Sequence, residues 1–347
     1  MDWITEFLNE LWDFTVQSLN DNIPLIVGSV KAVVIAVGIM SVVPALVWLE
    51  RRLMGRFQVR LGPNRVGPFG FGQPMADTLK LLFKESIIQA SADKFLFHLA
   101  PAVVVFTAIV AFAVIPFGAP FEIFGMNIEL WGANVNSGIL FVFAISGMGI
   151  YGMVIAGLSS NNKYSLMGGL RSSAQMISYE LTLGLSALSI IILTGSLSLV
   201  DMVLAQESVP FILIQPLAFL LFFIAGVAET NRAPFDLPEA EQELVAGFHT
   251  EYTGMKFAMF FMGEYINMVT MSALVTLLFL GGWNTYGVPL WPIIAFAGKV
   301  VFLLCVFIWL RSTFPRIRYD RLMTFGWKVL LPLCLLNLLI TGTIKVM

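Results

Sequence analysis

Residues 228–251 read Ala228-Glu-Thr-Asn-Arg-Ala-Pro-Phe-Asp-Leu-Pro-Glu-Ala-Glu-Gln-Glu-Leu-Val-Ala-Gly-Phe-His-Thr-Glu251. This stretch carries six carboxylates and one arginine, and it lies between two long apolar segments. Charge is costly close to a bilayer, so a chain that is mostly apolar does not need this much of it merely to reverse direction. The stretch indicates a place where a partner docks or where charge passes beside the membrane.

The composition of the whole chain is that of a membrane protein. Of its 347 residues, 58% are hydrophobic and 12% are charged, and the mean hydropathy is +0.86. A soluble domain would be about one quarter charged. We therefore predict an all-α polytopic membrane protein, since helices satisfy every backbone group within lipid and no alternating pattern of barrel strands is seen.

Eight segments are close to the roughly 20 apolar residues that a transmembrane helix needs. They are Ile23–Leu49, Phe95–Phe117, Ser137–Leu158, Ala174–Leu193, Phe211–Ala228, Phe257–Leu280, Leu290–Leu310 and Val329–Ile344. The predicted organisation is an N-terminal segment, 1–22, followed by an eight-helix membrane domain, 23–347, with inside loops 50–94, 159–173, 229–256 and 311–328.

The basic residues orient these spans. Eight follow the first span, two the third, two the fifth and five the seventh, which together make 17 of the 20 lysines and arginines. The alternate loops, about 118–136, 194–210 and 281–289, carry none. By the positive-inside rule, both termini are outside and the basic loops face the cytoplasm, or the matrix of an organelle. A bacterial inner membrane is favoured over a mitochondrial one.

The N-terminal segment has its own pattern. Trp3, Phe7 and Leu11 recur at helical spacing, whereas Asp2 and Glu6 fall elsewhere on the wheel. This pattern predicts a helix lying on the outer membrane interface, or alternatively an arm that binds a partner.

Chemistry that depends on metals or nucleotides is not indicated. Cys305 and Cys334 lie in separate apolar spans, and His98 and His249 have no ligand spacing. No phosphate-binding glycine motif follows a predicted strand. We therefore predict that this chain holds no metal or redox cofactor by itself.

The first inside loop contains an amphipathic helix. After the Gly- and Pro-rich run 61–74, Met75, Leu79 and Leu82 fall on one side of a helix and Asp77 and Lys80 on the rest. This helix either lies on the membrane surface with its lysines extended, or forms one wall of an opening between membrane and protein.

The acidic loop has a local helical pattern. Asp236 and Glu239 have capping-box spacing, and Glu239, Glu241 and Glu243 near a helix N-terminus would complement the helix dipole. That pattern does not account for Glu251.

Four carboxylates lie at or within the inner half of the membrane. Glu180 and Glu264 lie inside spans four and six, roughly 13 Å and 12 Å along the helix from the nearest base. Glu50 and Glu229 end spans one and five. Such acids could relay protons if they converge on a polar interior.

Two simpler interpretations of these acids remain open. They could make hydrogen bonds that pack helices together, for instance with Tyr179 or Tyr265, and Lys299 in span seven could pair with one of them.

Several motifs together resemble one family. They are Leu49-Glu-Arg-Arg52, Arg60-Leu-Gly-Pro-Asn-Arg-Val-Gly-Pro-Phe-Gly70, Asn161-Asn-Lys-Tyr164, Ile177-Ser-Tyr-Glu180, Ala228-Glu-Thr-Asn-Arg-Ala-Pro-Phe-Asp236, Phe261-Met-Gly-Glu-Tyr265 and Arg311-Ser-Thr-Phe-Pro-Arg-Ile-Arg-Tyr-Asp320. From about residue 23 onward the chain resembles the heel subunit of respiratory complex I, the proton-translocating NADH:quinone oxidoreductase. In bacteria this is the H subunit of the complex, and mitochondria have a counterpart of it.

The resemblance implies a function that the chain performs only within a complex. Such a subunit joins the redox arm to the membrane arm and forms the membrane side of a quinone chamber. Its substrate is a quinone, with ubiquinone favoured over menaquinone, whereas FMN and Fe–S clusters belong to partner subunits. The expected partners are the peripheral subunits at the quinone site and small subunits of the membrane arm, with no nucleic acid.

The resemblance also implies three sets of site residues. The chamber and its entrance would use Glu50, Arg51, Asp77, Glu85, Arg232 and Phe235. The proton path would use Glu50, Glu180, Glu229 and Glu264. The loop that couples quinone chemistry to that path would use Asp236, Glu239, Glu241, Glu243 and Glu251.

Three alternatives stand beside this interpretation. A related membrane-bound hydrogenase-type complex shares the fold and part of the acid pattern. A stand-alone ion transporter would also place acids in the membrane, but no clear inverted repeat is found. A purely structural anchor would not need the pair Glu180 and Glu264.

Overall fold

The computed structural model describes residues 2–123, 126–128, 130–133, 135–236, 245–288 and 291–346, with side chains described from residue 28 onward and not for the strands. The longer helices are α1 (Asp2–Phe57), α2 (Gln73–Phe83), α3 (Lys94–Phe112), α4 (Gly138–Ser159), α5 (Lys163–Thr194), α8 (Pro216–Glu229), α10 (Met255–Phe279), α11 (Pro292–Thr313) and α13 (Leu331–Val346). Shorter elements are α6 (Leu199–Leu204), α7 (Phe211–Ile214), α12 (Tyr319–Phe325), two 3-10 turns at Pro68–Gly70 and Gly247–His249, and a π-helical turn at Gly326–Leu330.

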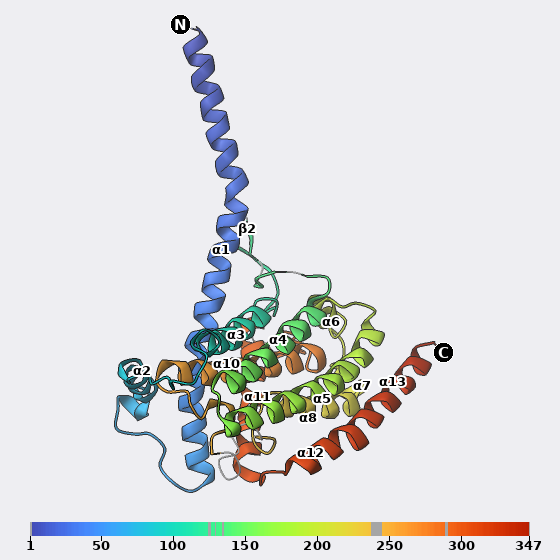
Figure 1. Cartoon of the computed structure of the whole chain (residues 1–347). Coiled ribbons are helices and arrows are strands. Elements are labelled where there is room, and N and C mark those ends of the chain that lie inside the picture. Colours follow the sequence, from blue (N-terminus) through green and yellow to red (C-terminus); the bar gives the residue numbers. More distant parts are fainter. Residues whose placement is uncertain are drawn as a thin grey trace.

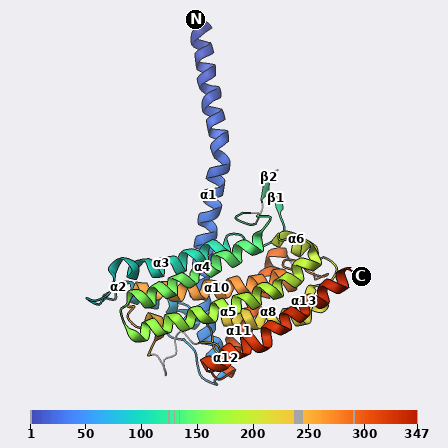
Figure 2. The ribbon, with the colours of Figure 1, turned by 45° about the vertical axis from the view of Figure 1, so that its right-hand side comes forward.

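The fold is a bundle of long apolar helices, as the sequence predicts. Helices α3, α4, α5, α10 and α13 run side by side, and α1 crosses them and continues beyond the bundle (Figure 1). In the second view, α2 lies at one end of these helices, with α6 and the C-terminus at the other (Figure 2). Within the described residues, seven helices are long and apolar enough to cross a membrane, and α8 is a shorter apolar helix at the position of the predicted fifth span.

The chain includes one small sheet that the sequence did not predict. Strands β1 (Phe121–Ile123) and β2 (Met126–Ile128) pair antiparallel in the loop after α3. Because each strand has only three residues, the pattern is too short to be seen as an alternation of apolar and polar residues.

Helix α5 begins earlier than expected. The predicted span starts at Ala174, whereas α5 starts at Lys163 and covers most of the predicted inside loop 159–173. Asn162 is the N-cap, and its side chain accepts a hydrogen bond from the backbone N–H of Tyr164. The charged residues of this segment do not break a helix, so the capping amide determines where it begins.

Proline determines two breaks in the apolar segments. The predicted span Phe211–Ala228 divides into α7 and α8 at Gln215, because Pro216 disfavours helical geometry at the residue before it. The last span contains a π-helical turn just before Pro332, where a proline clashes with the carbonyl four residues earlier.

The N-terminal segment is helical and continuous with the first span. Helix α1 runs without a break from Asp2 to Phe57, and the membrane-spanning part begins at Gly28. The location of residues 1–22 on a membrane interface stays a prediction.

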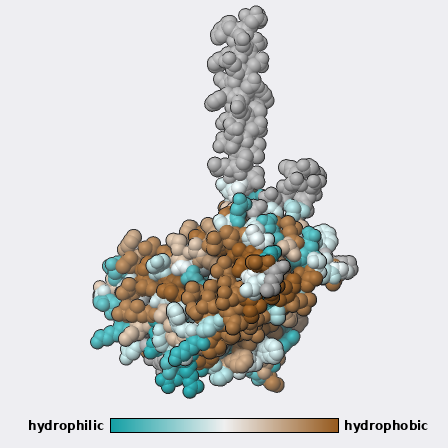
Figure 3. Space-filling view, turned by 90° about the vertical axis from the view of Figure 1, so that its right-hand side faces the viewer, coloured by the Kyte–Doolittle hydropathy of each residue, from teal (hydrophilic) through white to brown (hydrophobic). Residues whose placement is uncertain are grey.

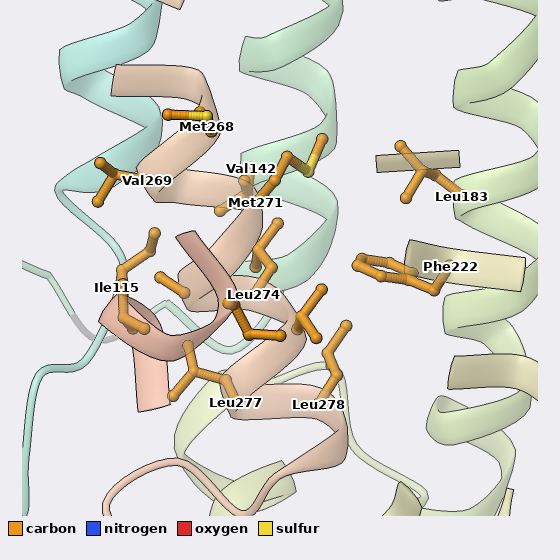
Figure 4. Packing of buried hydrophobic residues seen from close by; sticks show 14 of the residues in the cluster. Ile115, Val142, Leu183, Phe222, Met268, Val269, Met271, Leu274, Leu277 and Leu278 are labelled. Carbon is orange, nitrogen blue, oxygen red and sulfur yellow. The ribbon is translucent and has the colours of Figure 1, made fainter. Parts of the chain in front are cut away.

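Helix α10 is the centre of the bundle. Within its most apolar window, 83% of the residues are buried, a larger share than in any other candidate span of the described chain. Its apolar side chains, among them Met268, Met271 and Leu274, pack toward Val142 of α4 and toward Leu183 and Phe222 on α5 and α8 (Figure 4). A helix in this position is surrounded by other helices, so any polar side chain on it must find a partner inside the protein.

The outside of the bundle is apolar over a broad area. Hydrophobic residues cover much of the face shown in Figure 3, and hydrophilic residues gather toward its edges. This distribution suits a protein whose sides face lipid and whose ends face water.

Candidate functional site

A buried carboxylate joins three helices at one end of the bundle. Glu50, near the end of α1, is only 3% exposed. Tyr265 of α10 donates a hydrogen bond of 2.6 Å to Glu50 Oε2, and Arg311 in the last turn of α11 forms an ion pair with Glu50 Oε1. A carboxylate at this depth is stable only when charge and hydrogen bonds compensate it, and these two residues provide both.

A second buried ion pair lies beside the first. Arg232 Nη2 is 3.9 Å from Glu264 Oε2, and both side chains are under 10% exposed. The guanidinium of Arg232 also lies over the ring of Tyr265, 4.3 Å from its centroid. Tyr265 therefore connects the two pairs, with one arginine over its ring and Glu50 at its hydroxyl.

The residues Glu229–Arg232 form a tight turn that carries Arg232 into this cluster. Helix α8 ends at Glu229, and Asn231 has φ +51°, in the left-handed region where asparagine is tolerated. The Asn231 side chain points its Nδ2 toward the sulfurs of Met176 and Met153, at 3.4 and 3.6 Å. The turn is thus fixed from inside the bundle, as in other helix ends capped by a left-handed residue.

Gln175 holds this turn and was not among the predicted site residues. The side chain is fully buried on α5, and its Nε2 donates to the carbonyls of Ala228 and Phe235, each at 2.8 Å. These carbonyls lie on either side of the turn, so one amide fixes both of its ends. The signal available in the sequence was an amide side chain within a predicted span.

Glu229 and Glu180 form a second group of acids. Glu229 is 4% exposed, and neither of its carboxylate oxygens has a hydrogen-bond partner. Glu180 lies on α5 and is close enough to act on Glu229 electrostatically. A Cβ placed on Gly147 of α4 would lie 2.7 Å from Glu180 Oε1, so the glycine leaves the space that the carboxylate occupies.

Arg51 and Asp77 pair at the exposed side of this site. Arg51 Nη1 is 2.5 Å from Asp77 Oδ2, with the side chains 44% and 25% exposed. Gln73 Nε2 donates to the other oxygen of Asp77 at 3.2 Å. The predicted entrance pair, Glu50 and Arg51, is therefore divided: Glu50 faces the bundle, and Arg51 ties α1 to α2.

The remaining predicted residues lie around the loop that precedes α10. Glu251 accepts a 2.6 Å hydrogen bond from Asn162, the N-cap of α5. The backbone carbonyl of Asp236 accepts from Arg316, and Phe235 is buried. Glu85 is exposed outside the cluster. The acids Glu239, Glu241 and Glu243, together with their predicted helix, lie outside the described residues.

The loop before α10 docks on α5 through backbone contacts. A Cβ on Gly168 would lie 2.6 Å from the backbone nitrogen of Phe248 and 2.7 Å from the carbonyl carbon of Gly247. The ring of Tyr252 stacks on Phe97 at 4.0 Å, and its hydroxyl shares a 3.2 Å hydrogen bond with Ser159. Burial raises the pKa of Tyr252 to about 12, against a smaller lowering by Ser159, so this phenol is neutral at pH 7.

Of the two simpler interpretations of the membrane acids, the structure shows a hydrogen bond from tyrosine but no pairing with Lys299 among the described residues. Tyr265 does form a hydrogen bond with a site carboxylate, Glu50, whereas Tyr179 donates to the carbonyl of Leu322. Lys299 forms no ion pair with an acid among the described residues, because its Nζ donates to three carbonyls that follow α10. No group of three metal-ligating side chains is found among the described residues.

The fold and site together define a class: a polytopic helical membrane protein in which two arginines pair with buried acids at one end of its helices. A family model described as NADH dehydrogenase matches residues 30–342. The chain belongs to the family formed by the H subunits of NADH-quinone oxidoreductase, which confirms the resemblance that its motifs indicated.

Relatives from three bacteria match most of the chain. The second H subunit of NADH-quinone oxidoreductase in Syntrophobacter fumaroxidans is 51% identical over 312 residues, which cover 90% of this chain and 94% of the relative. The second H subunit in Geobacter sulfurreducens is 54% identical, and the match covers 88% of this chain and 92% of the relative. The H subunit of Protochlamydia amoebophila is 53% identical, with 86% and 91% covered.

Removing Arg311 should destabilise the protein more than removing both members of its pair. In Arg311→Met the Glu50 carboxylate stays buried without its counter-charge, at a cost of roughly 3 kcal/mol. In Glu50→Gln/Arg311→Met the amide can still accept from Tyr265, so most of that loss should be recovered. The measurement is the thermal unfolding midpoint of the purified assembly.

Arg318→Met is the matched control for this pair. Arg318 and Asp320 form an ion pair with side chains 79% and 67% exposed, and such surface pairs contribute about 1 kcal/mol or less. If Glu50→Gln/Arg311→Met were as unstable as Arg311→Met alone, the missing counter-charge would not be the reason for the loss of stability.

Gly168→Ala should loosen the loop before α10 without changing any charge. The added methyl group meets backbone atoms of Gly247 and Phe248, so the loop must shift, and its amides should exchange with deuterium roughly tenfold faster. Gly184→Ala on the same helix is the control, because nothing lies within 4 Å of its Cβ. Equal exchange over residues 245–254 in both variants would contradict this docking.

Proposed function

We propose that this chain is the membrane subunit of a NADH-quinone oxidoreductase that forms the membrane side of the quinone chamber. It couples quinone reduction to proton translocation through its carboxylates. The observation that carries the proposal is the buried cluster of Glu50, Tyr265, Arg311, Arg232 and Glu264, at the inner ends of helices in a chain of this family. Acids and bases buried this deeply are costly for stability and are therefore a signature of function.

The entrance to the chamber lies between α1 and α2. Helix α2 leaves an apolar face exposed, with Met75 69%, Leu79 52% and Phe83 87% accessible. The Arg51–Asp77 pair fixes this helix against α1. A quinone carries an apolar tail and a polar head, so an apolar wall beside charged residues suits its passage from the bilayer. Glu85, Arg232 and Phe235 complete the proposed chamber and its surroundings.

Quinone reduction can act on the buried acids through charge and protons. The reduction of a quinone to a quinol takes up two protons, and in a region of low dielectric any change of charge is felt over several ångströms. Glu50 and Glu264 lie in one network through Tyr265, and Glu180 and Glu229 form the next group along α5 and α8. We infer that protons and charge pass between these two groups.

The loop 229–256 couples the two processes. It begins at Glu229, carries Arg232 into the cluster, and ends on α5 through the Glu251–Asn162 hydrogen bond and the Gly168 contact. A shift at Arg232 can therefore reach α5, which carries Glu180. Asp236, Glu239, Glu241 and Glu243 would add the charge on which this movement acts.

The chain works only as part of an assembly. NADH oxidation requires FMN and Fe–S clusters, which partner subunits supply, and a quinone is the substrate that this chain helps to enclose. The basic loops then face the cytoplasm of a bacterial cell, where the redox subunits dock.

The experiment that tests this function is purification through an affinity tag on the chain in mild detergent. The co-purifying assembly should reduce a quinone with NADH, and an inhibitor of the quinone site should block the reaction. A lone protein would favour the transporter interpretation, and partners that oxidise hydrogen or ferredoxin but not NADH would favour the hydrogenase-type complex.

Glu180→Gln and Glu264→Gln should impair quinone-linked turnover and leave the complex assembled. Each substitution keeps the size of the side chain and removes a proton-carrying group, so NADH-driven quinone reduction should fall roughly tenfold or more. Turnover and proton pumping are measured in membrane vesicles.

Glu207→Gln is the control, since Glu207 is exposed beyond the opposite end of the bundle, next to α6. The coupling role would be excluded if turnover and pumping were both normal in the Glu180 and Glu264 variants.

A further inference from the structure

An apolar groove runs along the side of the bundle, away from the acid cluster. It has a volume of about 610 Å³ and lies between α1, α10 and α11. Its walls include Val34 and Val42 of α1, Ala273 of α10, and Phe296 and Val301 of α11. Val34 and Val301 are 63% and 47% exposed, so the groove opens toward the surroundings of the protein. An apolar groove facing a bilayer is filled by hydrocarbon, because water finds no hydrogen-bond partners there.

The groove has the dimensions of a single lipid chain. Along α1 it extends from Val30 to Val42, which is about 18 Å of helix at 1.5 Å per residue. Half of a bilayer's hydrocarbon core is about 15 Å thick. The groove therefore suits a flexible hydrocarbon chain that spans one leaflet.

One cation lies at the outer end of the groove. Lys31 lines it together with Trp131, near the start of the membrane-spanning part of α1 and remote from Glu50. The turn that carries Trp131 lies against α1, since a Cβ on Gly132 would be 3.0 Å from Ile35 Cδ1. Lysine and tryptophan are the residues that mark the level of lipid headgroups.

Lys31 differs from the other two lysines of the outer half. Lys299 donates to the carbonyls of Leu280, Gly282 and Asn284, and Lys345 donates to the carbonyl of Leu193. Among the residues that the structure describes, no carboxylate forms an ion pair with Lys31, and no carbonyl accepts from it. Its charge is available to a ligand.

We propose that this groove binds an anionic phospholipid from the leaflet opposite the basic loops. One acyl chain lies between α1, α10 and α11, and the phosphate pairs with Lys31. The bound lipid fills a gap beside α10, the central helix, and so supports the packing of α1 and α11 around it.

The test measures lipid retention by native mass spectrometry. The tagged assembly is delipidated in mild detergent and then exposed to vesicles of phosphatidylglycerol or of phosphatidylcholine. The wild-type assembly should retain phosphatidylglycerol in preference to phosphatidylcholine. Lys31→Gln should weaken phosphatidylglycerol binding roughly fivefold, since one lysine near an anionic headgroup contributes that much. Lys345→Gln, which removes an exposed lysine of the same outer half, should leave binding unchanged.

A photo-crosslinking residue in place of Val301 identifies the occupant independently. An adduct of phospholipid mass on this chain supports the proposal. Crosslinking to a partner subunit or to the quinone tail overturns it, as does an equal loss of lipid in the Lys31 and Lys345 variants.

Discussion

The buried carboxyl group of Glu50 is the constraint around which one end of the bundle is arranged. A carboxylate that is 3% exposed must receive charge and hydrogen bonds from the protein. Arg311 and Tyr265 supply them from α11 and α10, so three helices from opposite ends of the chain must meet at one point. The ring of Tyr265 also contacts the guanidinium of Arg232, which pairs with Glu264. The contacts that stabilise Glu50 are therefore part of a larger network.

That network depends on the position of the buried backbone turn that follows α8. The turn after α8 places Arg232 in the cluster, and it is held by the amide of Gln175 and the left-handed conformation of Asn231. The next part of the loop that the structure describes docks on Gly168 and ends at the N-cap of α5. Helix α5 therefore contacts both ends of the loop and also carries Glu180. In the proposed mechanism, this one helix links movement at the cluster to the environment of Glu180.

Most of the fold could be predicted from the sequence, because hydropathy and charge are sums over short windows. Helix α4, Gly138–Ser159, lies within one residue of its predicted span at either end. Predictions were less accurate where a single residue decides the local geometry. Asn162 moves the start of α5, and Pro216 divides the fifth span. The hairpin of β1 and β2 is too short to leave a periodic pattern.

By itself, the sequence determined the class of protein, the positions of most of its apolar helices, and which acids lie within them, since lipid admits only apolar helices and makes every buried charge costly. Only the tertiary structure decided which groups meet. Glu50 and Arg51 are neighbours in sequence but face different partners, and the partner of Glu50 is Arg311, 261 residues away. Such pairings arise from the way helices pack, and neither the hydropathy nor the period of a segment contains that information.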